Sequence, residues 1–294
     1  MTMLRKNVEV IGPRSLPGHY LLDLLSESGF VGRQLGRTHT AGLNSSIEQF
    51  PWTYLDALDP KEWLPEENAA VISLLPLWLL PPLLPRLNQC RQLIAFGSTS
   101  VFTKLESRDV DEREVAGKLA EAEESIIATC SAKGIPWTIL RPTLVYDEGR
   151  DQNVSAIARF IKRWGVFPLV TPGQGLRQPV HAQDLALAAL QALDNPLTFN
   201  RSFNLSGGET LTYRQMVERI FKSLGRTPRI LPVPLALAET PFRMFKRLRK
   251  TAHSPALFRR MNQDLCFDSS DARSAMGYDP RPFNPDFAKS CPRL

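Results

Sequence analysis

The sequence predicts an α/β protein in which a Rossmann-type, doubly wound parallel sheet carries a smaller, interleaved C-terminal cap domain. Three observations support this fold. Short apolar runs rich in β-branched residues alternate with helical patterns along the first two-thirds of the chain. The first such run ends in a glycine and leads into a helix, and beyond residue 150 the pattern becomes mixed and rich in proline. Alternating strands and helices are typical of βαβ units and a parallel sheet.

Hydrophobic periodicity and capping residues set the expected elements. Strands are predicted over 8–11, 31–35, 70–74, 93–96 and 137–140, and helices over 18–28, 112–133 and 184–193. Asp184, after the strand-like segment PVH, is the expected N-cap of the last of these helices. Further helices are expected over 154–164 and 213–224. We therefore expect a dinucleotide-binding domain over 1–150, to which 178–195 returns, and a cap built from 151–177 and 196–294.

Composition narrows the class of protein. The chain has 294 residues, of which 43% are hydrophobic and 22% are charged, so it can bury a full core. The N-terminal segment MTMLRKNVEVIG does not resemble a signal peptide. The cysteines lie far apart with no C-x-x-C pair, which predicts neither a metal site nor a disulfide framework and favours a cytoplasmic protein: Cys90, Cys130, Cys266 and Cys291.

One apolar stretch, residues 69–85, has the length of a short membrane span but contains several prolines. Proline removes a backbone donor and interrupts a helix, which a spanning helix tolerates poorly. The stretch is therefore predicted to be a buried strand followed by a broken, apolar helical segment.

A candidate phosphate-binding loop follows the first predicted strand, in VEVIGPRSLPGHYLLDLL. Short-chain dehydrogenases place glycines at G-x-x-G-x-x-G, and here the three positions hold Gly12, Ser15 and Gly18. The first glycine permits a tight turn, the middle position lets the backbone approach a pyrophosphate, and the last allows close packing of helix on strand. The alternative is an ordinary strand–turn–helix junction without a cofactor.

The residues that follow the second predicted strand indicate which dinucleotide binds. The segment VGRQLGRTHT contains arginines and no acidic residue, and Arg37 directly follows the strand. A basic residue there accommodates a 2′-phosphate, whereas an acidic one binds the free ribose hydroxyl. NADP is therefore favoured over NAD, unless Arg37 is only a solvated loop residue.

Segments spread along nearly the whole chain resemble one family. AFGSTSVF, GIPWTILRPTLVYDEGRDQN, GLRQPVHAQDLALAAL and FNLSGGETLTYRQMVERI are similar, in order and spacing, to segments of the NAD(P)-dependent nucleoside-diphosphate-sugar epimerases and dehydratases, which are extended short-chain dehydrogenases/reductases. The resemblance implies hydride and proton transfer on a sugar nucleotide or a related hydroxylated substrate. It also implies that Pro142 and Thr143 border the nicotinamide and that Asp56 lies near the adenine.

The family's catalytic residues are only partly present. The resemblance places Ser98 at the catalytic serine and Lys118 at the lysine of Y-x-x-x-K, but the tyrosine position holds Glu114. In the family the lysine lowers the pKa of the tyrosine, which then acts as general acid and base. Glu114 could replace it as a base, or Glu114 and Lys118 could form an ordinary i,i+4 ion pair.

Two further residues are candidates for substrate binding. Tyr146, in RPTLVYDEG, could reach the site from another loop, although packing is the simpler explanation. The resemblance places Arg177 where such enzymes bind a substrate diphosphate, a task that suits the guanidinium fork. Its alternative role is a salt bridge to the cap.

The positive charge of the chain is concentrated near its C-terminal end. Residues 240–263 carry seven basic residues and no acidic one, whereas the net charge of the whole chain is +6. Within TPFRMFKRLRK, helical spacing would place aromatic and basic residues in separate stripes. Residues 240–260 could thus contact an anionic membrane surface or an acidic partner, or form an ordinary solvated helix of the cap.

Two functions compete at this stage. The first is an NADP-dependent enzyme acting on a small-molecule substrate, a sugar nucleotide or a related compound. The second is a non-catalytic protein that binds NADP(H) as a sensor or structural element, which the substitution at Glu114 favours. Nucleic-acid binding is not expected, because aromatic residues interleave with the basic ones but no recognition motif is present. The protein is expected to be a monomer or a homodimer.

Overall fold

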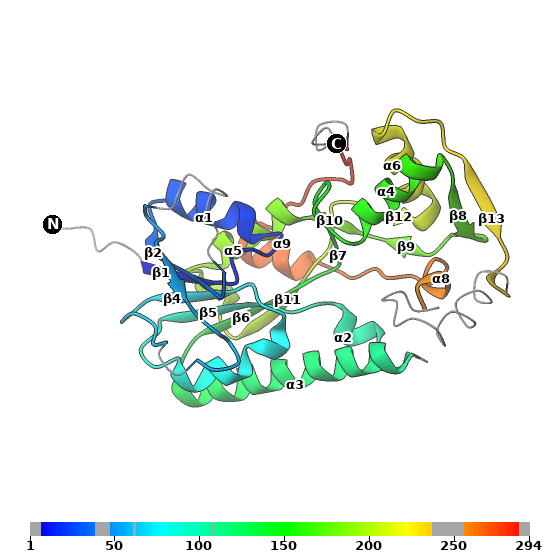
Figure 1. The fold of residues 1–294 in the computed structure, drawn as a ribbon. Helices are drawn as coiled ribbons and strands as arrows, with labels where there is room; N and C mark the ends of the chain where they lie inside the picture. The colour runs from blue at the N-terminus through cyan, green and yellow to red at the C-terminus, as the bar shows by residue number, and fades with distance from the viewer. Residues whose placement is uncertain (1–6, 39–47, 61–62, 108, 237–255, 288–294) are drawn as a thin grey trace.

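A central parallel sheet organises the protein. The computed structural model describes residues 7–38, 48–60, 63–107, 109–236 and 256–287. Seven strands hydrogen-bond in the order β11-β6-β5-β4-β1-β2-β3, every neighbouring pair being parallel (Figure 1). Their bounds are β1 Asn7–Ile11, β2 Val31–Gly36, β3 Trp52–Tyr54, β4 Ala70–Ser73, β5 Gln92–Phe96, β6 Trp137–Pro142 and β11 Arg201–Leu205. The predicted fold class is confirmed.

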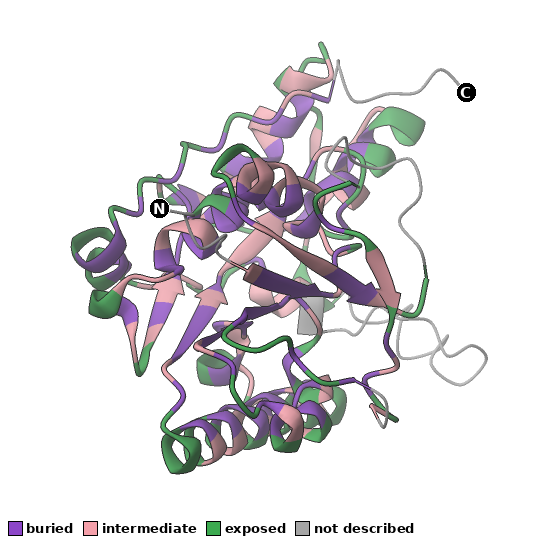
Figure 2. Cartoon of the chain, turned by 90° about the vertical axis from the view of Figure 1, so that its left-hand side faces the viewer, coloured by how far each residue is buried: buried purple, intermediate pink, exposed green. Residues whose placement is uncertain are grey.

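Helices cover both faces of this sheet. One face packs against α1 (Gly18–Glu27), α5 (Ala182–Ala192) and α9 (Ser270–Met276), and the other against α3 (Val110–Lys133) with the short 3₁₀ helices η1 (Leu77–Leu79) and η2 (Pro81–Arg86) (Figure 1). The central strands are accordingly buried along their length, while α3 shows a buried and an exposed side (Figure 2). Burial on both faces explains why β4 and β5 read as continuous apolar runs.

The sequence predicts where most helices start, with one exception. Asp109 caps α3 by accepting the amides of Asp111 and Glu112, and Gly134 ends the helix in a left-handed conformation. Helix α5, however, begins at Ala182, and its N-cap is His181 and not Asp184. The imidazole of His181 accepts the amide of Gln183, so Asp184 lies in the first turn of the helix.

The apolar stretch 69–85 folds as predicted, since it forms β4 and then η1 and η2, whose prolines suit short 3₁₀ turns. Across the described ranges, no helix combines the length and apolar character needed to cross a membrane.

The cap has an apolar core of its own, built mainly from α4 (Val154–Trp164) and α6 (Tyr213–Ser223). Three small sheets extend it: β8 (Phe167–Val170) with β13 (Ile230–Val233), β9 (Leu176–Arg177) with β12 (Leu211–Thr212), and β10 (Pro179–His181) with β7 (Leu144–Tyr146). Strand β11 and helix α9 lie within the range predicted for the cap, yet they pack with the central sheet. The two parts therefore interleave further than the sequence predicts.

Candidate functional site

The carboxyl ends of the parallel strands bring three of the predicted site residues to one edge of the sheet. Gly12 follows β1, Ser98 comes shortly after β5, and Thr143 follows β6. Parallel strands all end at the same edge, which is where open α/β sheets bind their ligands. The cap lies beyond this edge (Figure 1).

The loop between β1 and α1 is a tight turn that requires glycine at two positions. Gly12 has a φ of +76°, which favours glycine, and a Cβ there would lie 3.0 Å from Leu75 Cδ2. A Cβ on Gly18 would lie 2.1 Å from the Pro13 carbonyl oxygen, so only glycine lets α1 start this close to the loop. The Ser15 hydroxyl accepts the Gly18 amide at 3.3 Å. These features fit the pyrophosphate of a dinucleotide, although Ser15 engages an amide that a glycine would leave to the ligand.

The two predicted adenosine-side residues lie at the ends of adjacent strands. Arg37 directly follows β2 and is exposed. Asp56 follows β3, and its side chain accepts the Leu58 amide at 3.0 Å. Arg33, by contrast, lies within β2 and forms ion pairs with Glu9 and Glu66, so it has a structural role. Of the two arginines in this segment, Arg37 is the exposed one.

A cavity of about 1290 Å³ lies between the sheet edge and the cap, and Ser98, Thr143 and Arg177 all line it. Helix α2 (Ser100–Thr103), the loop that follows it, β7 and α8 (Ala256–Arg260) supply much of the remaining wall. The lining is rich in hydroxyl groups, which can bind a polyhydroxylated ligand: Ser98, Thr99, Ser100, Thr103, Ser107 and Thr143.

Hydrogen bonds hold the hydroxyls near the sheet edge in place. Ser98 Oγ accepts the Ser100 amide at 3.1 Å, which leaves its proton available to a ligand. The Thr143 hydroxyl donates to the Gln178 carbonyl and so ties β6 to the strand that returns from the cap. The Pro142 carbonyl accepts the amide and the hydroxyl of Thr99, 3.2 and 3.1 Å away, so it is fully used within the protein.

The predicted pair Glu114 and Lys118 lies on a different face of α3. Their side chains are 60% and 50% exposed, and Lys118 Nζ lies 2.5 Å from Glu114 Oε1. Neither residue lines the cavity. The hydrogen bond and the charge of Lys118 lower the pKa of Glu114, so this carboxyl is ionised at neutral pH and cannot serve as a proton donor there. The geometry matches the ordinary ion pair among the two predicted alternatives.

Arg177 is buried at the cap side of the cavity, but it forms no salt bridge of the predicted kind among the described residues. Its guanidinium donates to the carbonyls of Leu176 and Gln263, each 2.7 Å away, and to that of Arg260. The Tyr213 ring lies 5.3 Å from its Cζ. Burial lowers the pKa of Arg177, and the nearby charge of Asp264 offsets only part of this shift. An anion entering the cavity would offset the rest.

Tyr146 does not reach the cavity. Its side chain is 1% exposed and its ring packs edge-on against His181 and Phe283, with centroids 5.1 and 5.0 Å away. Burial raises the pKa of its hydroxyl far above the ordinary range. The prediction that Tyr146 binds substrate is therefore wrong, because its side chain belongs to the apolar core of the cap.

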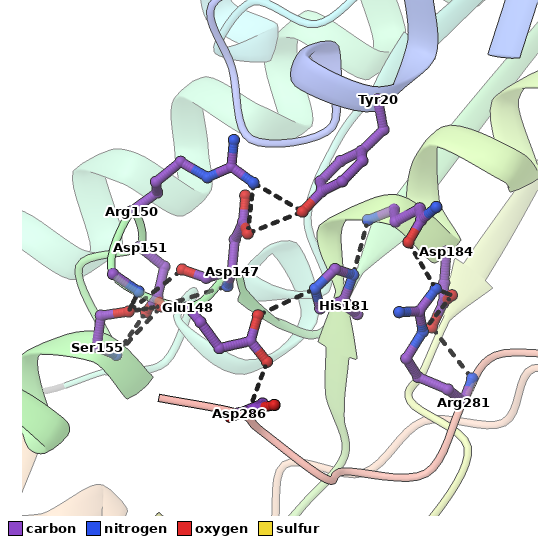
Figure 3. A network of polar contacts seen from close by, with 12 residues as sticks. Tyr20, Asp147, Glu148, Arg150, Asp151, Ser155, His181, Asp184, Arg281 and Asp286 are labelled. Atoms are coloured by element: carbon purple, nitrogen blue, oxygen red, sulfur yellow. Dashed lines mark hydrogen bonds and ion pairs between the residues drawn. The ribbon is translucent and has the colours of Figure 1, made fainter. Parts of the chain in front are cut away.

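A polar network beside Tyr146 joins α1 to the loop after β7 (Figure 3). The Tyr20 hydroxyl donates to Asp147 Oδ1 at 3.1 Å and accepts from Arg150 at 2.7 Å, while His181 Nε2 lies 3.2 Å from Glu148. The ligand atoms of Asp147, Glu148 and His181 lie within 4.8 Å of one another. His181 Nδ1 already accepts the Gln183 amide, so Nε2 carries the proton and has no lone pair for a metal. The network therefore fastens the cap to α1 without needing a metal.

Four cations line the cavity, and sequence reasoning identified only Arg177. Lys104, Arg259 and Arg260 are the others, accompanied by the acids Glu106, Asp109 and Glu112. Arg260 forms an ion pair with Glu112, which also accepts the Ser107 hydroxyl at 2.7 Å. Glu112 lies two residues before Glu114, but helical geometry turns it inward. Its i,i+3 and i,i+4 neighbours are apolar or small, so no motif marked it in the sequence.

These features are those of a Rossmann-type fold with a capped cavity at the carboxyl edge of its sheet. A family model described as "NAD dependent epimerase/dehydratase family" matches residues 86–206. UDP-glucose 4-epimerase of Vibrio cholerae is 24% identical over 177 residues, which are 60% of this chain and 52% of that protein. Subunit 9 of the NADH dehydrogenase [ubiquinone] 1 alpha subcomplex of Arabidopsis thaliana is 29% identical over 122 residues, 41% of this chain and 29% of the subunit. The chain thus matches about half or less of these relatives' lengths.

Solved structures agree on the fold. UDP-glucose 4-epimerase of Thermotoga maritima, in a structure with UDP-glucose, superposes with a TM-score of 0.65 at 16% identity, covering 93% of each chain. The segment 86–206 is thus similar to the NAD-dependent epimerase/dehydratase family, and the whole chain has the fold of a UDP-sugar epimerase.

Proposed function

We propose that this protein binds NADP(H) and a sugar nucleotide, or a related hydroxylated substrate, in the cavity at the carboxyl edge of its sheet. The observation that carries the proposal is the convergence of Ser98, Thr143 and Arg177 on one hydroxyl-rich, cationic cavity. The loop with Gly12, Ser15 and Gly18 lies at the same edge and would hold the pyrophosphate. Pro142, Thr143 and Asp56 would border the nicotinamide and adenine ends.

Each part of the cavity has a task in this proposal. The nicotinamide ring, when bound, supplies or accepts a hydride. The Ser98 hydroxyl donates to a substrate oxygen near the sheet edge. The Arg177 guanidinium, which forms no ion pair among the described residues, binds the diphosphate. The names of two relatives agree with this substrate class, since both act on or hold UDP-glucose.

The proton transfer is assigned to a group inside the cavity and not to Glu114 with Lys118. That pair faces solvent, and the lowered pKa of Glu114 keeps it charged. Glu112 is the carboxyl group on α3 that does line the cavity, next to Ser107 and Arg260. We propose it as the acid/base candidate in place of Glu114.

A non-catalytic role is the second candidate. The exposed Glu114–Lys118 pair favours this role, because the positions that resemble the family's catalytic Tyr–Lys pair hold an ordinary surface ion pair. The Arabidopsis relative is named as a subunit of the NADH dehydrogenase [ubiquinone] 1 alpha subcomplex, which supports a role as a component of a larger assembly. Such a protein would bind NADP(H) without turning over a substrate, as a monomer, a homodimer or a subunit.

The test has two steps. The full chain is first titrated by calorimetry with NADPH and then with UDP-glucose. The absorbance of the nicotinamide band is then followed while a panel of sugar nucleotides is added. The proposal expects saturable binding of both ligands. Binding of both with a change in absorbance supports the enzyme, and binding of NADPH with no change in any member of the panel supports the second candidate. If UDP-glucose and the other sugar nucleotides do not bind at all, the assignment of the cavity is wrong.

A further inference from the structure

Lys104 occupies an unusual position in the cavity wall. It directly follows α2, and its backbone is fixed on both sides, because its amide donates to the Ser100 carbonyl and its carbonyl accepts the Ser107 amide, both at 3.1 Å. Its side chain is half-buried and lines the cavity beside Thr103 and Ser107. The lysine is therefore held at the wall by the fold and is not a freely solvated surface residue.

The charge of Lys104 is not neutralised by the protein that the structure describes. No carboxylate pairs with its ammonium group within the described ranges, and the charge that acts on it is the positive charge of Arg260. Burial and this charge both lower the pKa of Lys104. Partly burying an uncompensated ammonium beside a guanidinium costs free energy, which a bound anion would recover.

The acidic residues of the same wall are occupied elsewhere. Asp109 accepts the amides of Asp111 and Glu112 as the cap of α3, and Glu112 pairs with Arg260 and Ser107. Glu106 is exposed. The basic side chains that line the cavity therefore outnumber the acidic ones.

The position of Lys104 along the cavity identifies which part of a ligand it meets. Helix α2 begins at Ser100, shortly after Ser98, and is directly followed by Lys104. All three residues line the cavity, so Lys104 belongs to the wall that begins at the carboxyl edge of the sheet. Arg177 lies on β9, on the cap side. A sugar nucleotide whose diphosphate is bound by Arg177 would place its sugar, and not its phosphates, toward the wall with Lys104.

We propose that Lys104, backed by Arg260, binds a carboxylate on the sugar, so that the cavity selects acidic sugar nucleotides over neutral ones. This inference rests on the proposed function. A lysine forms a charge-assisted hydrogen bond with a carboxylate, whereas a neutral hydroxymethyl group at the same position would leave the ammonium uncompensated. Lys104 is thus a specificity-determining residue for the substrate.

The experiment compares two nucleotides that differ only at one sugar carbon, UDP-glucuronic acid and UDP-glucose. Both are titrated by calorimetry into the full chain saturated with NADPH. A hydrogen bond to a charged group contributes about 1.5–3 kcal/mol, so we expect the acid to bind about 10- to 100-fold more tightly than the neutral sugar. Lys104→Met should abolish this ratio while changing the affinity for UDP-glucose by less than about 3-fold. Lys104→Arg should retain most of it, and Lys222→Met, at an exposed lysine on α6, is the matched control.

Each other outcome contradicts the inference in a recognisable way. Equal affinities of the wild-type protein for the two nucleotides would overturn it while leaving the proposed function intact. An equal loss of both affinities in Lys104→Met would assign the lysine to the diphosphate and overturn the carboxylate site. Failure of the wild-type protein to bind either nucleotide would overturn the proposed function, and the inference with it.

Discussion

The carboxyl edge of the sheet and the outward face of α3 differ sharply, although both correspond to parts of the family's active site. At the edge, Gly12 and Gly18 occupy positions that only glycine suits, and Ser98 and Thr143 line a cavity. On α3, Glu114 and Lys118 keep the family's spacing but lie in solvent, paired with each other. The proposed binding residues and the predicted catalytic pair therefore lie on different elements of the fold.

Helix α3 repeats the contrast within its first turns. Glu112 and Glu114 are chemically identical and two residues apart, which places them on different sides of a helix. Glu112 is buried against Arg260 and borders the cavity, whereas Glu114 is exposed. The side of the helix, and not the residue type, decides which carboxylate can meet a substrate.

The largest effect is expected from Gly18→Val at the carboxyl edge. A Cβ would lie 2.1 Å from the Pro13 carbonyl oxygen, so the loop or the start of α1 must move away from the place where the pyrophosphate would bind. We expect NADPH binding to be lost in calorimetry while the circular dichroism spectrum stays that of a folded α/β protein. Gly117→Ala is the matched control, because a Cβ there meets no atom within 4 Å. A folded Gly18→Val protein with wild-type affinity would place the cofactor elsewhere.

Glu112→Gln should have an intermediate effect, on stability. It leaves the charge of Arg260 without its partner in a site where the side chains are 26% and 10% exposed. Removing one partner of a largely buried pair costs about 1–3 kcal/mol after allowance for the partial exposure of Arg260. Urea unfolding should show a lower midpoint with an unchanged slope. A midpoint equal to that of the wild type would mean that the pair contributes nothing and that the two faces of α3 do not differ.

The smallest effect is expected from Glu114→Gln and Lys118→Met on the outward face. An exposed i,i+4 pair contributes about 0.3–0.5 kcal/mol, so either change should be almost silent in urea unfolding. Because neither residue lines the cavity, the affinity for NADPH and any turnover should also stay within about 2-fold of wild type, a change of under about 0.4 kcal/mol. Loss of turnover in Glu114→Gln, with binding preserved, would restore the pair to a catalytic role.

Most of the fold could be predicted because its strands and helices carry strong local patterns. The five predicted strands and the long helix α3 follow from buried apolar runs and from helical periodicity. Strand β3 is only Trp52–Tyr54 and half-exposed, so it left little pattern, and β11 was assigned to the cap because it lies far along the chain from its partner β6. His181 was missed as an N-cap because histidine rarely has that role, whereas Asp184 is a common one.

The site was harder to predict than the fold. The sequence identified the residues at the strand ends, Gly12, Gly18, Ser98 and Thr143, since parallel topology gathers them at one edge. Tyr146 was misjudged because its direction depends on β7 pairing with β10, which buries it beside His181. Lys104, Glu112 and Arg260 come together only through tertiary packing of the α2–α3 loop on α8, and no spacing in the sequence shows this. The predictions that rest on residues 240–255 lie outside the described part of the chain and remain predictions.

The most direct test of the central claim, that the carboxyl edge retains dinucleotide binding, is calorimetric titration of the wild-type protein and Arg37→Ala with NADPH and NADH. Arg37 is exposed at the end of β2, where a 2′-phosphate would lie. We expect the wild type to prefer NADPH by about 10-fold or more, as one charge-assisted contact allows, and Arg37→Ala to lose the preference while still binding NADH. Equal binding of the two dinucleotides by the wild type would contradict the assignment of Arg37, and binding of neither would contradict the central claim itself.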